Sequence, residues 1–438
     1  MHYLTKSCVA ALAGLAVSVP AFAQTEVVVW IGAEPGQATV YDTLAEQFNA
    51  ENPGVKINMV KTPSDLFNPA LIPALSAGEG PDLFMFGTGP GQPAAIIAGG
   101  LVADLTPYFE KYDWGKTIPA GVINQTSKDG KLWALGNEVE TTAMFYNKAV
   151  FAEHGISVPA SWADLEAAVE KLKAAGYDTP IGLGAADKWP TSHWQSMLFG
   201  RYAGPEGIAN VMFADGKWSD EPFVKASARL QEMAQKGWFG PNPVAINYAE
   251  LMDRFWAGDI PMTFTGLWVI PGGLEVVGDR APDYSVFQVP PLEEGQKIYP
   301  TESIGNGWYI RANSEHKEIA AAFMNRTFFS TDGRAELLSG GAVPVGPLDD
   351  ALAKADIPQL NQDLGKSADM YRGNGTVPAF LDTITPGNLT TASYDGLQAL
   401  LLGVMTPEEF TEELQREWQI AKDEGTILAP GCLSVAAE

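Results

Sequence analysis

The chain has 438 residues, of which 46% are hydrophobic and 18% charged, and its formal net charge is −25 at pH 7. This length is sufficient for two domains with substantial cores, and the composition is unlike that of a disordered chain. The acidic excess would repel a phosphate backbone, so nucleic acid is not an expected partner.

The first 23 residues have the features of a cleaved secretory signal. Lys6 provides a short positive start, residues 8–19 are apolar and small, and Ala21-Phe22-Ala23 fits the pattern before a signal peptidase cut. We therefore expect cleavage after Ala23 and export to the periplasm. The apolar run is shorter than the roughly 20 residues that cross a bilayer, and Gln24 is not a lipidated cysteine, so no membrane anchor is expected.

After cleavage the chain would have neither a disulfide nor a cluster of metal ligands. Cys8 would leave with the signal, and Cys432 alone cannot form an intramolecular disulfide. The remaining histidines, His154, His193 and His316, have no metal-ligand spacing. We expect no metal and no cofactor.

Strands alternate with helices in the N-terminal third. Residues 26–31 are β-branched and apolar, which predicts a strand, and the apolar residues over 40–48 recur at helical spacing. Residues 55–60 predict a second strand, a helix follows near 66–77, and residues 82–86 predict a third strand. The alternation favours parallel strands in an open α/β sheet.

The rest of the chain continues with the same kinds of element. A helix that begins at the N-cap Ser161 leads to a predicted strand over 181–184. Further strands are predicted over 260–265, 284–289 and 304–311, and helices over 314–328, over 394–402 and from Thr406 onward. Ligands of open α/β sheets bind at the carboxyl ends of the strands, so the loops after Ile31 and Phe86 are expected to face one cleft.

Five short runs occur in a specific order along the chain. They are AGEGPDL at 77–83, GGLVADLT at 99–106, DGKLWAL at 129–135, FYNK at 145–148 and GNGWYI at 305–310. In order and spacing they resemble the extracellular solute-binding proteins of sugar ABC transporters, family 1, the maltose-binding-protein-like group. The likeness covers essentially residues 25–425.

The resemblance implies the two-lobed type II fold of periplasmic binding proteins, in which each α/β lobe is an open sheet flanked by helices. The ligand cleft would lie between the lobes, with residues 24–139 plus 298–345 in lobe 1 and residues 140–297 plus 346–438 in lobe 2. The chain would cross between the lobes near Glu140, Glu294 and Gly346.

A sugar site needs aromatic rings for the apolar faces of the sugar and polar groups for its hydroxyls. The resemblance implies a sugar-stacking ring at Trp268, and further contacts at Trp189, His193 and Trp194 after the strand at 181–184. One of Trp189 and Trp194 is expected to stack on the sugar while the other packs against a helix. A core position is the alternative for every Trp.

Polar contacts are expected from both lobes. Glu140 matches the family's ligand-binding carboxylate at the first crossing, where a structural role is the alternative, and Glu34 follows the first strand, where it could instead be solvated. The Asp-Arg pair that maltose-binding protein has after the third strand is replaced here by Gly87-Thr88-Gly89-Pro90-Gly91-Gln92, which leaves Thr88 and Gln92 as candidates. This loop has no following Lys, so a phosphate-binding loop is not expected.

Asn306 and Trp308 are further candidate contacts, although Trp308 could pack in the sheet. Together with the resemblance, these features favour a monomeric periplasmic protein that captures a sugar or small oligosaccharide by lobe closure and delivers it to the permease subunits of an ABC transporter. A polyamine or another polar solute is the alternative ligand for the same fold. A secreted glycosidase is less favoured, because Glu138 and Glu140 would share one face of a strand rather than flank a bond.

Overall fold

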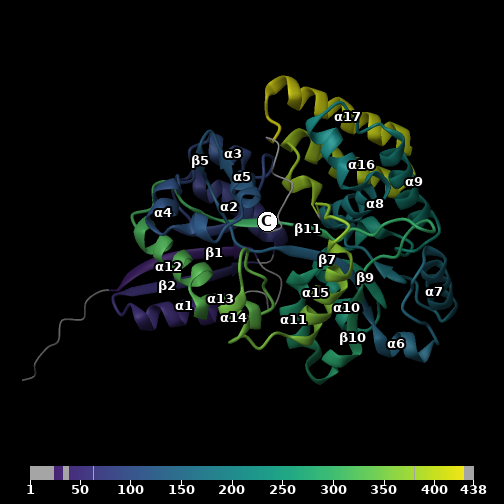
Figure 1. The fold of residues 1–438 in the computed structure, drawn as a ribbon, viewed down its shortest axis with the longest axis horizontal. Coiled ribbons are helices and arrows are strands. Elements are labelled where there is room, and N and C mark those ends of the chain that lie inside the picture. Colours follow the sequence, from purple (N-terminus) through teal and green to yellow (C-terminus); the bar gives the residue numbers. More distant parts are fainter. Residues whose placement is uncertain (1–23, 33–38, 63, 379, 429–438) are drawn as a thin grey trace, which may run out of the picture.

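The computed structural model describes residues 24–32, 39–62, 64–378 and 380–428, which form two α/β lobes side by side (Figure 1). The sheet of the first lobe has the order β2 (Val55–Thr62), β1 (Thr25–Gly32), β3 (Leu83–Gly87), β12 (Asn306–Ile310) and β6 (Leu135–Gly136). Around it lie α1 (Thr39–Glu51), α2 (Ser64–Ser76), α3 (Ala94–Ala98), α4 (Thr106–Lys111), η1 (Trp114–Lys116), α5 (Ala120–Thr126), the hairpin of β4 (Ser127–Lys128) and β5 (Lys131–Leu132), α12 (Lys317–Phe329) and α13 (Thr331–Ser339).

The second lobe has its own sheet, in the order β10 (Tyr284–Phe287), β7 (Glu140–Asn147), β9 (Met262–Gly266) and β8 (Ile181–Gly182), with β11 (Thr301–Ser303) also paired to β7. Its helices are α6 (Lys148–Glu153), α7 (Trp162–Ala174), η2 (Ala185–Asp187), α8 (Trp189–Phe213), α9 (Glu221–Gln235), η3 (Pro243–Ala245), α10 (Tyr248–Ala257), η4 (Leu267–Val269), α11 (Ile270–Val277), η5 (Gly278–Asp283), α15 (Gln359–Arg372), η6 (Leu381–Thr383), α16 (Gly387–Leu401) and α17 (Pro407–Glu424). The predicted two-lobed α/β fold is confirmed.

Alternation of side chains along β3 explains why helices cover both faces of the first sheet. Leu83 and Met85 pack with the cluster that includes α1 and α12, whereas Phe84 and Phe86 pack with α2 on the other face. β1 is parallel to both β2 and β3, but β12 is antiparallel to β3. Parallel pairing therefore holds for the N-terminal strands, while β12 joins the sheet from the second lobe in the opposite direction.

The first two connections between the lobes lie side by side. β7 begins at Glu140 and is antiparallel to β11, so that Ser303 pairs with Glu140. The chain passes from β11 into β12 at residues 304–305, which lie after the position near Glu294 where this crossing is predicted. Residues 301–303, predicted in lobe 1, consequently pair with the second sheet.

The third connection also falls later than its predicted position near Gly346. The Val139 amide donates a hydrogen bond of 2.9 Å to the Val343 carbonyl, beside the first crossing. α14 (Asp349–Leu352) still packs against α13 of the first lobe, and α15 is the helix that packs against β7 and β10. The helix α14, predicted in lobe 2, therefore lies with the first lobe, and the other limits of the two lobes stay a prediction.

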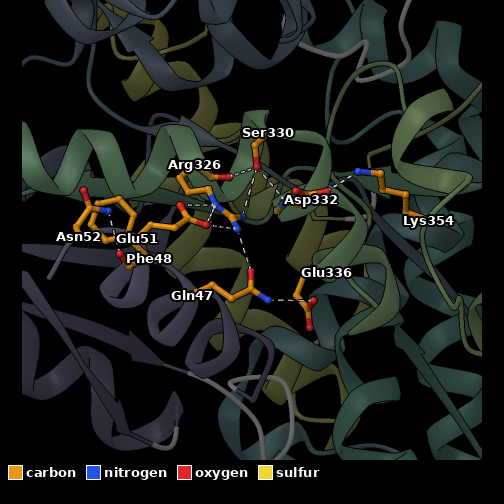
Figure 2. A network of polar contacts seen from close by, with 10 residues as sticks. Gln47, Phe48, Glu51, Asn52, Arg326, Ser330, Asp332, Glu336 and Lys354 are labelled. Carbon is orange, nitrogen blue, oxygen red and sulfur yellow. Dashed lines mark hydrogen bonds and ion pairs between the residues drawn. The ribbon is translucent and has the colours of Figure 1, made fainter.

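Hydrogen bonds connect α12 and α13, which follow the second crossing, to the N-terminal helix α1 (Figure 2). Arg326 of α12 donates to Glu51 and Gln47 of α1, and Gln47 donates in turn to Glu336 of α13. Figure 1 accordingly shows the green α12 and α13 beside the purple α1. Because the first lobe is completed by residues after position 300, the chain up to residue 140 is only part of a folding unit.

Candidate ligand-binding site

A cavity of about 420 Å³ is lined by residues of both lobes, and its size falls within the roughly 300–1,000 Å³ typical of small-molecule sites. Gly32 and Phe86 bring the carboxyl ends of β1 and β3 to it, as expected for an open α/β sheet. Phe67 and Met85 add apolar surface from the first lobe. Six predicted contacts line this cavity, namely Gln92, Glu140, Trp189, His193, Trp268 and Asn306.

One wall of the cavity is aromatic and belongs to the second lobe. Trp189 and His193 lie four residues apart at the start of α8 and share one face of that helix. The His193 ring centroid lies 5.4 Å from that of Trp268, which follows β9, and 4.1 Å from that of Phe380, which precedes η6. Trp189 is only partly buried, so its ring offers an accessible platform for the apolar face of a ligand.

Glu140 supplies a buried carboxyl at the first crossing. Burial is the main reason that the pKa of Glu140 lies well above its ordinary value, and the negative charges of Glu138 and Asp382 raise it further. Hydrogen bonding from the Gly305 backbone and the Asn306 side chain acts in the opposite direction. A Cβ at position 305 would lie 2.0 Å from Oε2 of Glu140, so any larger residue there would displace the Glu140 carboxyl.

A second buried carboxyl, Asp382, faces the same cavity from η6. Its Oδ2 accepts a hydrogen bond from the Tyr394 hydroxyl of α16, and another of 3.4 Å from Nε2 of Gln92 in the first lobe. Burial raises the pKa of Asp382 to about 6, although the Tyr394 hydrogen bond opposes the rise. Asp382 is thus a carboxyl shared by the two lobes.

Three of the predicted contacts lie in the core instead of the cavity lining. Trp194 is fully buried against Phe239 and Phe264, and Trp308 is fully buried against Tyr41. These two positions follow the core alternative: Trp194 of α8 packs against Phe264 of β9, and Trp308 of β12 packs against Tyr41 of α1.

Thr88 is also fully buried, and its hydroxyl donates 2.6 Å to the Ile304 carbonyl and accepts 2.8 Å from Gln125. It ties the end of β3 to the second crossing rather than facing the cavity. Glu34 lies outside the described residues.

Asp382 and Tyr394 are cavity residues that the sequence prediction missed. The available signal was weak: Asp382 is the one charged residue between Pro378 and Pro386, in an otherwise apolar and threonine-containing run. Tyr394 was expected only as the start of a helix, and no spacing in the sequence connects it with Gln92 or Glu140.

The lining of the cavity is acidic. Glu140, Asp382 and Asp187 contribute carboxyls, and none of the described lining residues is Lys or Arg. Within residues 24–32, 39–62, 64–378 and 380–428, no group of three or more His, Cys, Asp or Glu side chains is placed to hold a metal ion. Aromatic rings, hydroxyl and amide groups and carboxyls together can accept a ligand rich in hydrogen-bond donors.

Sequence similarity to known proteins extends over much of this chain. A binding protein of Brucella abortus (strain 2308) is 24% identical over 376 residues, 84% of this chain and 86% of the relative. The maltotriose-binding protein of Pyrococcus abyssi is 26% identical over 316 residues, 70% and 63% of the two chains. The sn-glycerol-3-phosphate-binding periplasmic protein of Escherichia coli O1:K1 is 28% identical over 273 residues, 57% and 58% of the two chains.

Solved structures show the same fold. A chitin oligosaccharide binding protein superimposes with a TM-score of 0.76 at 22% identity, covering 92% of this chain and 99% of that one. The family described as bacterial extracellular solute-binding protein matches residues 33–326, which is more than half of the chain. The chain therefore belongs to the bacterial extracellular solute-binding protein family.

Proposed function

We propose that this protein captures a sugar or small oligosaccharide by lobe closure and delivers it to the permease subunits of an ABC transporter. The observation that carries the proposal is the cavity itself, which is lined by Trp189 and Trp268 of the second lobe and by the Gln92 and Asn306 amides of the first, with Glu140 at the crossing between the lobes. Aromatic faces and carboxylate or amide groups are the two kinds of surface that a sugar needs. The names of relatives that bind maltotriose and chitin oligosaccharide support the same ligand class.

Lobe closure follows from the position of the site. The cavity takes side chains from both sheets, so a ligand that contacts both lobes binds the closed form more tightly than the open one. The closed form would then present both lobes to the permease. We further propose cleavage after Ala23, a periplasmic location and a monomeric state. None of the helices in the described part of the chain is long and apolar enough for a membrane span.

The competing ligand class is a polyamine, since three carboxyls line the cavity. A thermal-shift screen of the purified protein with galactose, maltotriose, chitobiose, xylobiose, stachyose and spermidine tests the two classes, because a ligand of the folded state raises the melting temperature. Calorimetry of any binder at 50 and 500 mM NaCl then follows. We expect the affinity for a neutral sugar to depend little on salt. A melting temperature that rises with spermidine alone, together with spermidine binding that 500 mM NaCl abolishes, would contradict the proposal.

We also propose that the protein binds its ligand without turnover. Glu138 accepts a hydrogen bond of 2.6 Å from the Tyr41 hydroxyl and is not among the residues that line the cavity, so it does not face a bound sugar together with Glu140. Chromatography of the bound oligosaccharide after prolonged incubation is expected to return it intact. Release of shorter sugars in proportion to the protein concentration would overturn this part of the proposal.

A further inference from the structure

Asp382 occupies a position in which its two carboxylate oxygens have different surroundings. Oδ2 is held by Tyr394 of the second lobe and Gln92 of the first, whereas Oδ1 is buried and has no hydrogen-bond partner among the described residues. The residue is 5% exposed and lines the cavity. A buried carboxylate oxygen without a donor is costly, so this oxygen is available to accept a hydrogen bond from a molecule bound in the cavity that Asp382 lines.

A second unpartnered atom lies in the same lining. Nδ1 of His193 is buried without a hydrogen-bond partner in the described part of the chain, and the His193 ring packs 4.1 Å from that of Phe380. Phe380 is two residues before Asp382, so both unpartnered atoms lie along one part of the second-lobe wall. Burial keeps the pKa of His193 well below its ordinary value, and the imidazole is therefore neutral at pH 7.

The charges around Asp382 restrict which chemical group of a ligand can lie beside it. The Glu140 carboxyl lies close enough to Asp382 for the negative charge of Asp382 to raise its pKa, and Lys and Arg are absent from the described lining residues. A phosphate or carboxylate group would meet two carboxyls without any compensating cation. A hydroxyl or an ammonium group would instead donate a hydrogen bond.

We propose that Asp382 is a ligand-binding residue that selects for a hydrogen-bond donor, a sugar hydroxyl or an ammonium group, and that it links ligand binding to lobe closure. Oδ1 accepts the donor of the ligand, while Oδ2 keeps the Gln92 side chain of the first lobe against the second. The inference rests on the proposed function, and it excludes anionic ligands such as sn-glycerol 3-phosphate. Tyr394 is a positioning residue, because it acts on the ligand through Asp382.

The test compares Asp382→Asn with the wild type by calorimetry, using the sugar from the panel above that binds the wild type most tightly. Asp253→Asn on α10 is the matched control, since Asp253 is exposed and lies outside the cavity lining. We expect Asp382→Asn to weaken binding about 10-fold or more, because a hydrogen bond to a charged group is lost, and Asp253→Asn to leave it unchanged. Melting temperatures of all variants without ligand show that each is folded.

Further arms identify the donor and keep the inference open to contradiction. With a neutral sugar, the loss of affinity in Asp382→Asn is expected to be the same at 50 and 500 mM NaCl. If spermidine binds instead, a loss of affinity in Asp382→Asn that shrinks with salt identifies an ammonium group as the donor. Tyr394→Phe, which keeps the carboxyl, is expected to weaken binding by a smaller factor. Unchanged affinity in Asp382→Asn, or binding of sn-glycerol 3-phosphate to the wild type, overturns the inference alone. Failure of every sugar to bind the wild type overturns the proposed function together with it.

Discussion

The carboxyl of Asp382 titrates at a higher pH in the folded protein than in the unfolded chain, because burial raises its pKa from 3.8 to about 6. Between these two values folding takes up a proton. The stability that this group contributes is therefore present below its unfolded pKa and is lost as the pH rises through its folded pKa. Tyr394 of α16, Glu140 of β7 and His193 of α8 are the titratable groups that share this part of the cavity.

We expect Asp382→Asn to be more stable than the wild type without ligand at pH 7.5, although it binds sugar less well. Asn keeps an acceptor for Tyr394 and removes the cost of a buried charge, so the free energy of unfolding should rise by on the order of 1–3 kcal/mol. Urea denaturation from pH 7.5 to pH 5 measures this, and the gain should shrink toward the acid end. If Asp382→Asn were less stable than the wild type throughout this pH range, the carboxylate would stabilise the folded protein, which contradicts the prediction.

Of the two tryptophans in the aromatic wall, Trp189 tests sugar stacking more cleanly than Trp268 does. Trp268 is 8% exposed and its indole donates to the Tyr248 hydroxyl at 2.8 Å, so its removal would disturb the core as well as the site. Trp189→Ala should weaken sugar binding about 10-fold with a smaller loss of stability, because the ring is partly exposed. Calorimetry measures the affinity, and Trp133→Ala is a control with a similarly exposed indole away from the cavity. Equal effects of the two variants would remove Trp189 from the site.

At the level of elements, the glycine-rich loop after β3 lies against the segment that carries Asp382. Gly89 has a φ of +85°, and a Cβ there would lie 1.6 Å from the Thr383 carbonyl. Gly91 approaches the same segment, because a Cβ at Gly91 would lie 2.7 Å from the Thr385 carbonyl oxygen. The loop is thus a backbone contact between the two lobes.

Gly89→Ala is expected to hinder closure and weaken sugar binding at least 10-fold, because the methyl group cannot be accommodated between the lobes. Gly100→Ala is a matched control: Gly100 also has a positive φ, +63°, but a Cβ there meets nothing within 4 Å. Both variants should lose about 1 kcal/mol of stability from the left-handed backbone. Calorimetry in which both variants bind the sugar equally would contradict a closing role for the loop.

Elements with a strong local pattern were predictable from the sequence. The five apolar residues that predicted the first helix, from Val40 to Phe48, are the buried residues of α1. The residues that required tertiary information were Asp382 and Tyr394, since their proximity to Gln92 depends on how the lobes meet. Trp194 and Trp308 show the same limit, because burial of a Trp depends on the elements that pack against it in the folded chain and is not encoded in its sequence neighbours.

At the scale of the whole molecule, the resemblance predicted two lobes but placed two of the crossings too early. At a crossing the chain leaves one sheet and enters the other without a break. In the sequence, β11 and β12 form one extended segment, and only their pairing with β7 and β3 shows that they belong to different sheets. α14 likewise has no sequence feature that assigns it to α13 of the first lobe. The order of elements was therefore predictable, and the residues at which the chain changes lobe were not.

The central claim, that a sugar binds between two lobes and closes them, is tested most directly by small-angle X-ray scattering of the purified protein. The radius of gyration is measured without ligand and with a saturating concentration of the best-binding sugar, with Asp382→Asn at the same sugar concentration as the comparison. The account predicts that the sugar reduces the radius of gyration of the wild type and reduces that of the variant less. A wild-type radius of gyration that stays unchanged at saturation would contradict it.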